Sequence, residues 1–195
     1  MKPITKSSPK LNPSTARAYS VGCSRSSSAK VARVDVVVGL GSNLGDRRFE
    51  LARALEGLAA LGTVLGVSRV YETPPLGPPQ PDYLNAAVRL ETTLAPLALL
   101  DALRAIERAA GRERGERWGA RTLDLDVLWI DGLSVYSKQL CVPHPQLTRR
   151  AFALAPLLDV APEATDPRTG ARYRELLDAL DAASLRPTDS PLQQR

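Results

Sequence analysis

The sequence predicts one soluble globular domain with an α+β fold, and three features of its 195 residues support this. Runs typical of β-strands alternate along the chain with runs that repeat apolar residues at helical spacing. Apolar residues make up 44% of the positions, which suffices for one domain with a sizeable core. No apolar run has the length needed to cross a bilayer, so we expect a soluble globular protein.

The first half of the domain predicts a strand, a helix and two more strands. Residues 34–40 form a β-branched run typical of a buried strand. Residues 46–61 follow with Asp46 placed to cap a helix. The apolar face of that helix is expected to hold Phe49, Leu51, Leu55 and Leu58. Residues 63–71 and 84–94 then predict strands on either side of a proline-dense loop.

The second half adds a helix and a strand. Pro96 opens the helix, which ends before Gly111, and residues 123–130 form a strand. The order strand, helix, strand, strand, helix, strand is the split βαβ arrangement of ferredoxin-like folds. We therefore expect a βαββαβ core with a mainly antiparallel sheet and flanking helices. Helical stretches near 148–158 and 174–182 predict a C-terminal extension.

The charge is concentrated at the start of the chain. Residues 1–34 hold seven of the 26 basic side chains and none of the 21 acidic ones, so the remainder carries 19 basic and 21 acidic residues. A pI near 9.5 therefore does not indicate a nucleic-acid surface on the domain. We predict a disordered basic tail over 1–32, a domain over 33–187 and a short tail over 188–195. The first tail fits either an organellar transit peptide or a dispensable extension, and Arg/Ala/Leu-rich usage favours the second, with a cytoplasmic location.

Two aspartates in the last predicted strand are candidate metal ligands. Asp124 and Asp126 lie two residues apart, so in a strand both side chains project from one face. Paired carboxylates can hold Mg²⁺ together with phosphates and water. On its own, the pair is more typical of an amphipathic strand whose solvent face happens to be acidic.

The arginines before that strand change this interpretation. Six of them and no lysine lie within residues 104–121, namely Arg104, Arg108, Arg112, Arg114, Arg117 and Arg121. The guanidinium fork matches phosphate oxygens, so arginines beside paired aspartates indicate phosphoryl chemistry. Arg104 and Arg108 have an alternative role as helical partners of Glu107.

Two further groups of residues suit a flat heterocycle and a nucleotide. Tyr83 and Asn85 share one strand face after the proline loop and offer a ring to stack on and an amide. A surface tyrosine and a strand-end asparagine remain the alternative for each residue alone. His144, between two prolines, is followed by Arg150 and Phe152.

Other motifs are excluded. The glycines of residues 39–45 do not match the dinucleotide-binding spacing, and a tight turn before a helix explains them. His144 is the only histidine and no G-x-S-x-G occurs, which argues against a serine hydrolase. The two cysteines have no metal or redox spacing.

Taken together, the motifs resemble the hydroxymethyl-dihydropterin pyrophosphokinase family of folate biosynthesis over roughly residues 34 to 180. The matching runs are Gly-Ser-Asn-Leu at 41–44, Thr-Pro-Pro-Leu-Gly at 73–77, Pro-Asp-Tyr-Leu-Asn at 81–85, Arg-Trp-Gly-Ala-Arg-Thr-Leu-Asp-Leu-Asp at 117–126 and Val-Pro-His-Pro at 142–145. Ala120 departs from the family, which often has proline there. The resemblance implies transfer of pyrophosphate from ATP to 6-hydroxymethyl-7,8-dihydropterin, with AMP released.

The resemblance also implies roles for individual residues. Asp124 and Asp126 would bind two Mg²⁺ ions and act in catalysis with Arg112 and Arg121. The pterin would contact Thr73, Pro74, Leu76, Tyr83, Asn85, Trp118 and Phe152. ATP, the co-substrate, would contact Glu107, Arg112, Arg114, Trp118, Arg121, His144 and Arg150. We expect a monomer without nucleic-acid or membrane partners. An RNA-binding module of the same fold class is the alternative, but the predicted central strands lack its aromatic pattern.

Overall fold

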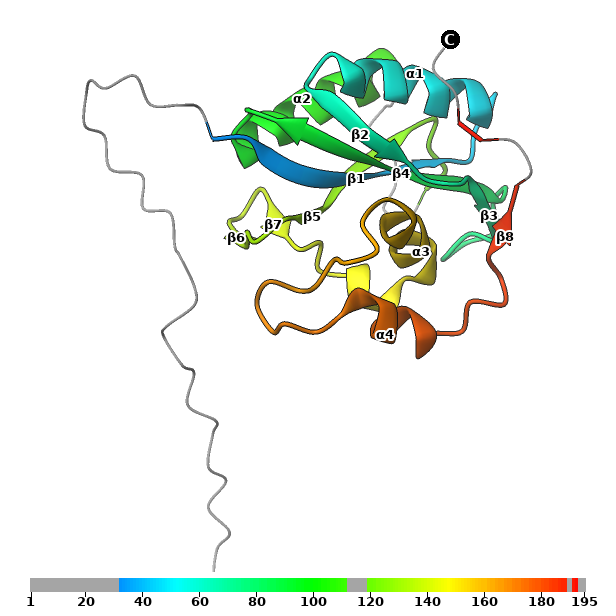
Figure 1. The fold of residues 1–195 in the computed structure, drawn as a ribbon. Helices are drawn as coiled ribbons and strands as arrows, with labels where there is room; N and C mark the ends of the chain where they lie inside the picture. Colours follow the sequence, from blue (N-terminus) through cyan, green and yellow to red (C-terminus); the bar gives the residue numbers. More distant parts are fainter. Residues whose placement is uncertain (1–31, 112–118, 189–190, 193–195) are drawn as a thin grey trace, which may run out of the picture. The chain divides into compact units, whose positions relative to one another are not determined.

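Six strands form one sheet whose neighbours all pair antiparallel, with helices on both faces (Figure 1). This computed structural model describes residues 32–111, 119–188 and 191–192. The described residues belong to one compact unit, Val31–Arg195. The sequence-based expectation of a mixed fold with an antiparallel sheet and flanking helices is therefore confirmed.

The sheet is centred on β1 (Val34–Ser42), which lies between β5 (Asp124–Ile130) and β4 (Tyr83–Thr92). β4 also pairs with β2 (Thr63–Val67) and β3 (Tyr71–Thr73), and β8 (Arg186–Pro187) lies beside β3. The single strand predicted over 63–71 is thus wrong, because two strands occupy it. Between them the Ser68 hydroxyl, rather than a ladder carbonyl, accepts from the Ala87 N–H at 2.8 Å.

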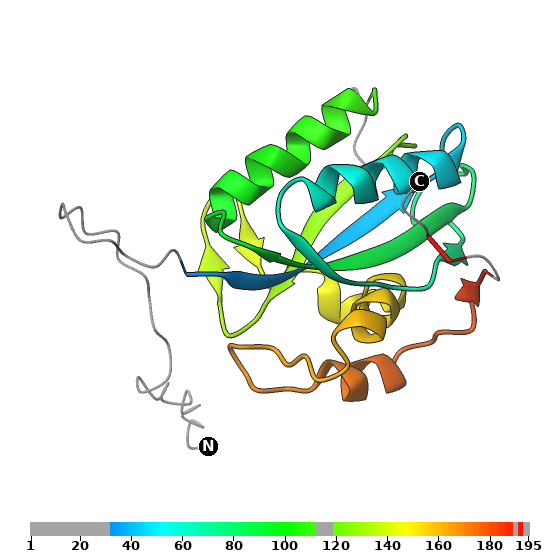
Figure 2. The same cartoon turned by 45° about the horizontal axis from the view of Figure 1, so that its top comes forward.

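The described part of the chain contains four α-helices. They lie on both faces of the sheet (Figures 1 and 2). α1 (Arg47–Ala59) and α2 (Pro96–Ala109) lie on one face, and α3 (Ala151–Val160) and α4 (Tyr173–Asp178) on the other, after a 3₁₀ turn over Leu147–Arg149. The Asp46 carboxylate accepts from the Phe49 N–H at 3.0 Å, which confirms the predicted cap. Phe49 itself is 40% exposed, so its predicted burial is wrong. It lies in the first turn, and Ala54 is buried further along α1.

Alternation along β1 divides the core into two parts. Val36, Val38 and Leu40 pack toward α1 and α2. Val37 packs into a second cluster that includes Leu154 and Leu157 of α3. After Val37, the next two positions on that face are glycines, Gly39 and Gly41. The α3 face of the sheet is therefore filled at one end of β1 and bare at the other.

Two features in the C-terminal part of the chain were not predicted. A hairpin pairs β6 (Val135–Tyr136) with β7 (Cys141–Val142), for which no strand was predicted. Leu192 is buried in the first core cluster, although residues 188–195 were expected to be a tail. No helix among the described residues is long and apolar enough to cross a membrane.

Candidate functional site

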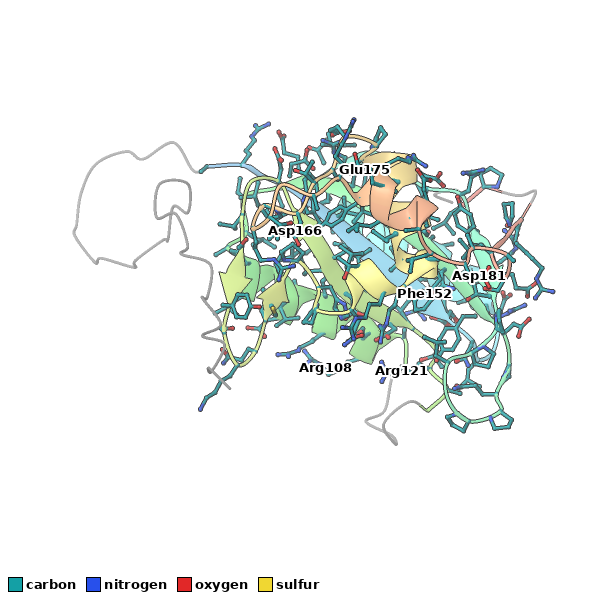
Figure 3. All side chains as sticks on the ribbon, turned by 90° about the horizontal axis from the view of Figure 1, so that it is seen from below. Arg108, Arg121, Phe152, Asp166, Glu175 and Asp181 are labelled. Atoms are coloured by element: carbon teal, nitrogen blue, oxygen red, sulfur yellow. The ribbon has the colours of Figure 1, made fainter. Side chains whose placement is uncertain are left out.

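A cavity of about 380 Å³ opens beside α3 at the bare end of β1. Its lining brings together eleven of the predicted site residues: Thr73, Pro74, Leu76, Tyr83, Asn85, Arg121, Asp124, Asp126, His144, Arg150 and Phe152. Figure 3 looks onto the α3 and α4 side of the sheet and labels Arg121 and Phe152 of this lining. Residues separated by up to 79 positions in the chain therefore share one site.

The floor of the cavity contains Gly39 and Gly41, which the sequence analysis assigned only to a tight turn. Both lie in β1, and the turn comes later, at Gly45 with its φ of 66°. A Cβ on Gly39 would stand 3.0 Å from the Leu128 side chain, so that position has little room for one. Two glycines two apart within a strand are the signal that could have identified this floor.

The strand register places the two aspartates directly across from these glycines. Asp124 pairs with Gly41, and Asp126 pairs with Gly39. Leu123 and Leu125 are buried while both aspartates are only partly so, as the alternation predicted. Because glycine has no side chain, the carboxylates meet open space on the inner side of β5.

The same register places Asn85 on the other side of Gly41. Asp124, Gly41 and Asn85 thus form one row across three strands. Neighbouring strands are about 4.8 Å apart, so Asp124 and Asn85 are separated by roughly 10 Å across the sheet. The row therefore has a carboxylate end at Asp124 and an amide end at Asn85, and we use these names for the two ends of the cavity.

At the amide end, Asn85 is 7% exposed and its orientation is set by Thr73. The Asn85 Nδ2 donates to the Thr73 Oγ1 at 2.8 Å. The Asn85 Oδ1 lies 3.6 Å from where a Cβ on Gly41 would stand, so this acceptor is near the floor. Tyr83 and Phe152 supply rings to the same cavity. The side chains at the amide end of the cavity can therefore accept hydrogen bonds from a flat ring and stack on its faces.

At the carboxylate end, Arg121 is ion-paired with Asp124. Its Nη1 donates to Asp124 Oδ2 at 2.8 Å. Asn43 bonds to both backbone polar groups of Arg121. The Asn43 Oδ1 accepts from the Arg121 N–H at 2.7 Å, and the backbone N–H of Asn43 donates to the Arg121 carbonyl at 3.1 Å. Asn43 was not predicted as a site residue.

Asn43 also reaches the proline loop. Its Nδ2 donates to the Gln80 Oε1 at 3.0 Å and to the Pro81 carbonyl at 3.1 Å. The residue is 1% exposed. A buried asparagine with this many backbone contacts fixes two separate wall segments of the cavity relative to β1.

His144 lies in the lining near both aspartates. Burial lowers the pKa of its imidazole below the ordinary value; the charges of Asp126 and Asp124 oppose this shift, and that of Arg150 adds to it. The ring is therefore neutral at neutral pH. The His144 Nδ1 accepts from the Gln146 N–H at 3.2 Å, which leaves the proton of the neutral ring on Nε2.

Of the other four predicted residues, the structure describes only Glu107. Glu107 is 7% exposed on α2 and is absent from the described lining; its carboxylate accepts from the Leu125 N–H at 2.8 Å. The carboxylate thus supports β5 between the two aspartates, and its contact with ATP stays a prediction. Arg112, Arg114 and Trp118 lie outside the described residues.

The donor set at the carboxylate end fits a hard divalent cation. Asp124 and Asp126 provide oxygen ligands from one rigid strand. Within residues 32–111, 119–188 and 191–192, no three His, Cys, Asp or Glu side chains are grouped to hold a metal. Such a site suits Mg²⁺, which takes one or two carboxylates and completes its shell with phosphates and water.

Comparison with known proteins identifies the family. A family model described as 7,8-dihydro-6-hydroxymethylpterin-pyrophosphokinase (HPPK) matches residues 37–162. The chain belongs to the HPPK family. The matched range contains every lining residue of the cavity.

Curated relatives agree. The chain is 40% identical over 162 residues to 2-amino-4-hydroxy-6-hydroxymethyldihydropteridine pyrophosphokinase of Synechocystis, covering 80% of this chain and 82% of the relative. It is 46% identical over 147 residues to the Pseudomonas aeruginosa enzyme of the same name, covering 74% and 90%. It is also 43% identical over 144 residues to the mitochondrial folate synthesis bifunctional protein of Arabidopsis thaliana, covering 73% of this chain and 26% of that one.

Solved structures of proteins that contain HPPK have the same fold as this chain. Plasmodium falciparum HPPK-DHPS with SDX-DHP superposes with a TM-score of 0.61 at 14% identity. The match covers 76% of this chain and 44% of that one, so this chain spans less than half of that larger protein. At this identity the likeness concerns the fold alone.

Proposed function

We propose that the cavity is the catalytic centre at which this enzyme transfers pyrophosphate from ATP to 6-hydroxymethyl-7,8-dihydropterin. Membership of the HPPK family makes the protein an ATP-dependent pyrophosphokinase of folate biosynthesis. The observation that carries the placement is the row of Asp124, Gly41 and Asn85. It sets a phosphate-and-metal end and a pterin end about two strand spacings apart on one rigid sheet.

The pterin would lie on the glycine floor at the amide end. Asn85, oriented by Thr73, would accept hydrogen bonds from the ring, and Tyr83 and Phe152 would stack on its faces. Pro74 and Leu76 would close the side of the pocket from the proline loop. Trp118 is proposed as a further pterin and ATP contact on family resemblance alone.

ATP would place its phosphates at the carboxylate end. Asp124 and Asp126 would hold the metal, for which we propose two Mg²⁺ ions that, when bound, neutralise the phosphate oxygens. Arg121, His144 and Arg150 lie in the same lining and would contact the nucleotide, with Arg112 and Arg114 added from outside the described residues. Glu107 would act through Leu125, by keeping β5 in place.

The chemistry then needs alignment and charge compensation. The hydroxymethyl oxygen attacks the β-phosphorus and loses its proton, the bond from that phosphorus to the α-phosphate oxygen breaks, and AMP leaves. No covalent intermediate with the enzyme is required. The chain contributes by holding both substrates on one sheet and by stabilising the charge that builds up on the phosphates.

We also propose a fold type, an oligomeric state and a cellular location. The strand order β5-β1-β4-β2 with α1 and α2 on one face supports a ferredoxin-like core, and α3, α4 and β8 would form its C-terminal extension. We propose a monomeric domain over 33–187 and a cytoplasmic location. Organellar targeting by residues 1–32 is the alternative, and one relative is a mitochondrial plant protein. An RNA-binding role is disfavoured, since β1 presents glycines where stacking aromatics would be needed.

Gly41→Val tests whether the pterin lies on the glycine floor. A Cβ at residue 41 would meet its neighbours at 3.6–3.8 Å, an ordinary contact, and the methyl groups of valine would extend from it over the floor. We expect the affinity for the pterin, measured calorimetrically with a non-hydrolysable ATP analogue, to fall by about a hundredfold.

Gly66→Val is the matched control. Gly66 lies in β2, and a Cβ there would stand 3.6 Å from Val160, outside the cavity lining. This variant should bind the pterin as the unmodified enzyme does. Undiminished pterin binding by Gly41→Val would show that the ring lies elsewhere.

A further inference from the structure

The ion pair between Arg121 and Asp124 occupies a proposed metal ligand. The Arg121 Nη1 lies 2.8 Å from Asp124 Oδ2, and both side chains line the cavity. A divalent cation that binds the Asp124 carboxylate through either oxygen would lie within a few Å of this guanidinium. Cation and guanidinium repel each other, so they compete for this carboxylate.

This ion pair is weak because neither partner is deeply buried. The side chains of Arg121 and Asp124 are 32% and 26% exposed. Ion pairs with this much solvent contact contribute little to stability. Releasing Asp124 therefore costs little, provided that the guanidinium finds another anion.

The anchoring of Arg121 defines which part of it can move. Asn43 bonds both the N–H and the carbonyl of Arg121, at 2.7 and 3.1 Å. The backbone at this position is thereby fixed to the end of β1. A movement of the guanidinium therefore takes place by rotation about the side-chain torsions of Arg121, which already lines the cavity.

The free enzyme also offers a metal few ligands. Among the described residues, no set of three metal-binding side chains is grouped at any point. Two carboxylates, one of them already paired with Arg121, leave most of the Mg²⁺ shell to phosphates and water.

From these contacts we propose that Arg121 is an exchangeable counterion of Asp124. It holds the carboxylate while the nucleotide site is empty, and it transfers to a phosphate oxygen when ATP and Mg²⁺ enter together. This inference rests on the metal role proposed for Asp124 and Asp126. Its consequence is that Arg121 suppresses metal binding by the empty enzyme, so cation and nucleotide are taken up as one complex.

The test is a titration with Mn²⁺, a paramagnetic substitute for Mg²⁺, without nucleotide or pterin. Free Mn²⁺ is measured by electron paramagnetic resonance at low ionic strength. Arg121→Gln should bind Mn²⁺ roughly three- to tenfold more tightly than the unmodified enzyme, because a nearby positive charge has been removed. Arg121→Lys, which keeps the charge, should restore weak binding.

Arg104→Gln controls for net charge. Arg104 forms an i,i+3 pair with Asp101 at 3.5 Å on α2, away from the cavity lining, and its loss removes the same charge. Its Mn²⁺ affinity should equal that of the unmodified enzyme. Equal affinity of Arg121→Gln and the unmodified enzyme, including undetectable binding by both, would overturn the exchange.

A double variant separates this inference from the metal assignment. Adding Asp126→Asn to Arg121→Gln should abolish the gained Mn²⁺ binding. If the gain persists, the ion binds somewhere else, and both the exchange and the metal role of the aspartates are overturned. Failure of the exchange alone leaves the reaction untouched, since product formation is measured independently.

Discussion

Asp124→Asn and Asp126→Asn are each expected to lower the rate of AMP formation by about a thousandfold or more. Asparagine has nearly the shape of aspartate, but its neutral amide is a poor Mg²⁺ ligand. Both side chains face the cavity across from glycines, so the change does not disturb the core. The measurement is AMP released at saturating ATP and pterin, together with the circular dichroism spectrum and melting temperature of each variant.

Asp131→Asn provides the matched control. Asp131 follows β5 directly but lies at its other end, exposed in the turn before Gly132. Loss of its charge should leave the rate unchanged. Rates within about tenfold of the unmodified enzyme for both cavity variants would contradict the assigned metal site.

Asn85→Leu should weaken pterin binding by roughly a hundredfold or more. Leucine has the same branched arrangement of non-hydrogen side-chain atoms as asparagine but lacks the acceptor that lies near Gly41. Donor groups of the bound ring would then be buried without a partner, which is costly in a site built to bond them. The KM for the pterin should rise by this factor, while the KM for ATP stays within a few fold.

Thr73→Val tests how much the orientation of the Asn85 amide contributes to pterin binding, because it leaves the amide itself in place. The Thr73 Oγ1 accepts from Asn85 Nδ2 at 2.8 Å, so valine releases the amide to rotate. A rise of about tenfold in the pterin KM is expected, smaller than for Asn85→Leu. An unchanged pterin KM in Asn85→Leu would place the ring outside this end of the cavity.

The last strand of the βαββαβ pattern illustrates what local periodicity predicts well. In β5 the leucines are buried and the aspartates face the cavity, as two-residue alternation requires. The starts of α1 and α2 were also predicted, because Asp46 and Pro96 act within the first turns of their own helices. Local chemistry determines such features, so the sequence alone reveals them.

Features that depend on distant partners were missed. At the break between β2 and β3, Ser68 bonds to Ala87, which lies 19 residues away. β8 is two residues long and exists only because Arg186 and Pro187 pair with β3. Neither leaves a periodic signal in the sequence.

The site divides in the same way. Side chains with evident chemistry, such as Asp124 and Tyr83, were predicted with their correct faces. The glycine floor was not, since an absent side chain carries no chemical signal and its meaning depends on the register with β4 and β5. Asn43 was missed because its partners, Arg121 and the Gln80–Pro81 segment, are remote in sequence.

In the proposed reaction, the β- and γ-phosphoryl groups of ATP are transferred together onto the pterin in this cavity. The direct test is to incubate the enzyme with Mg²⁺, ATP and 6-hydroxymethyl-7,8-dihydropterin and to analyse the products by ³¹P NMR and chromatography. We predict AMP as the nucleotide product and a diphosphate on the pterin, with no nucleotide cleavage when the pterin is omitted. ADP with a monophosphorylated pterin, or cleavage of ATP that does not require the pterin, would contradict the account.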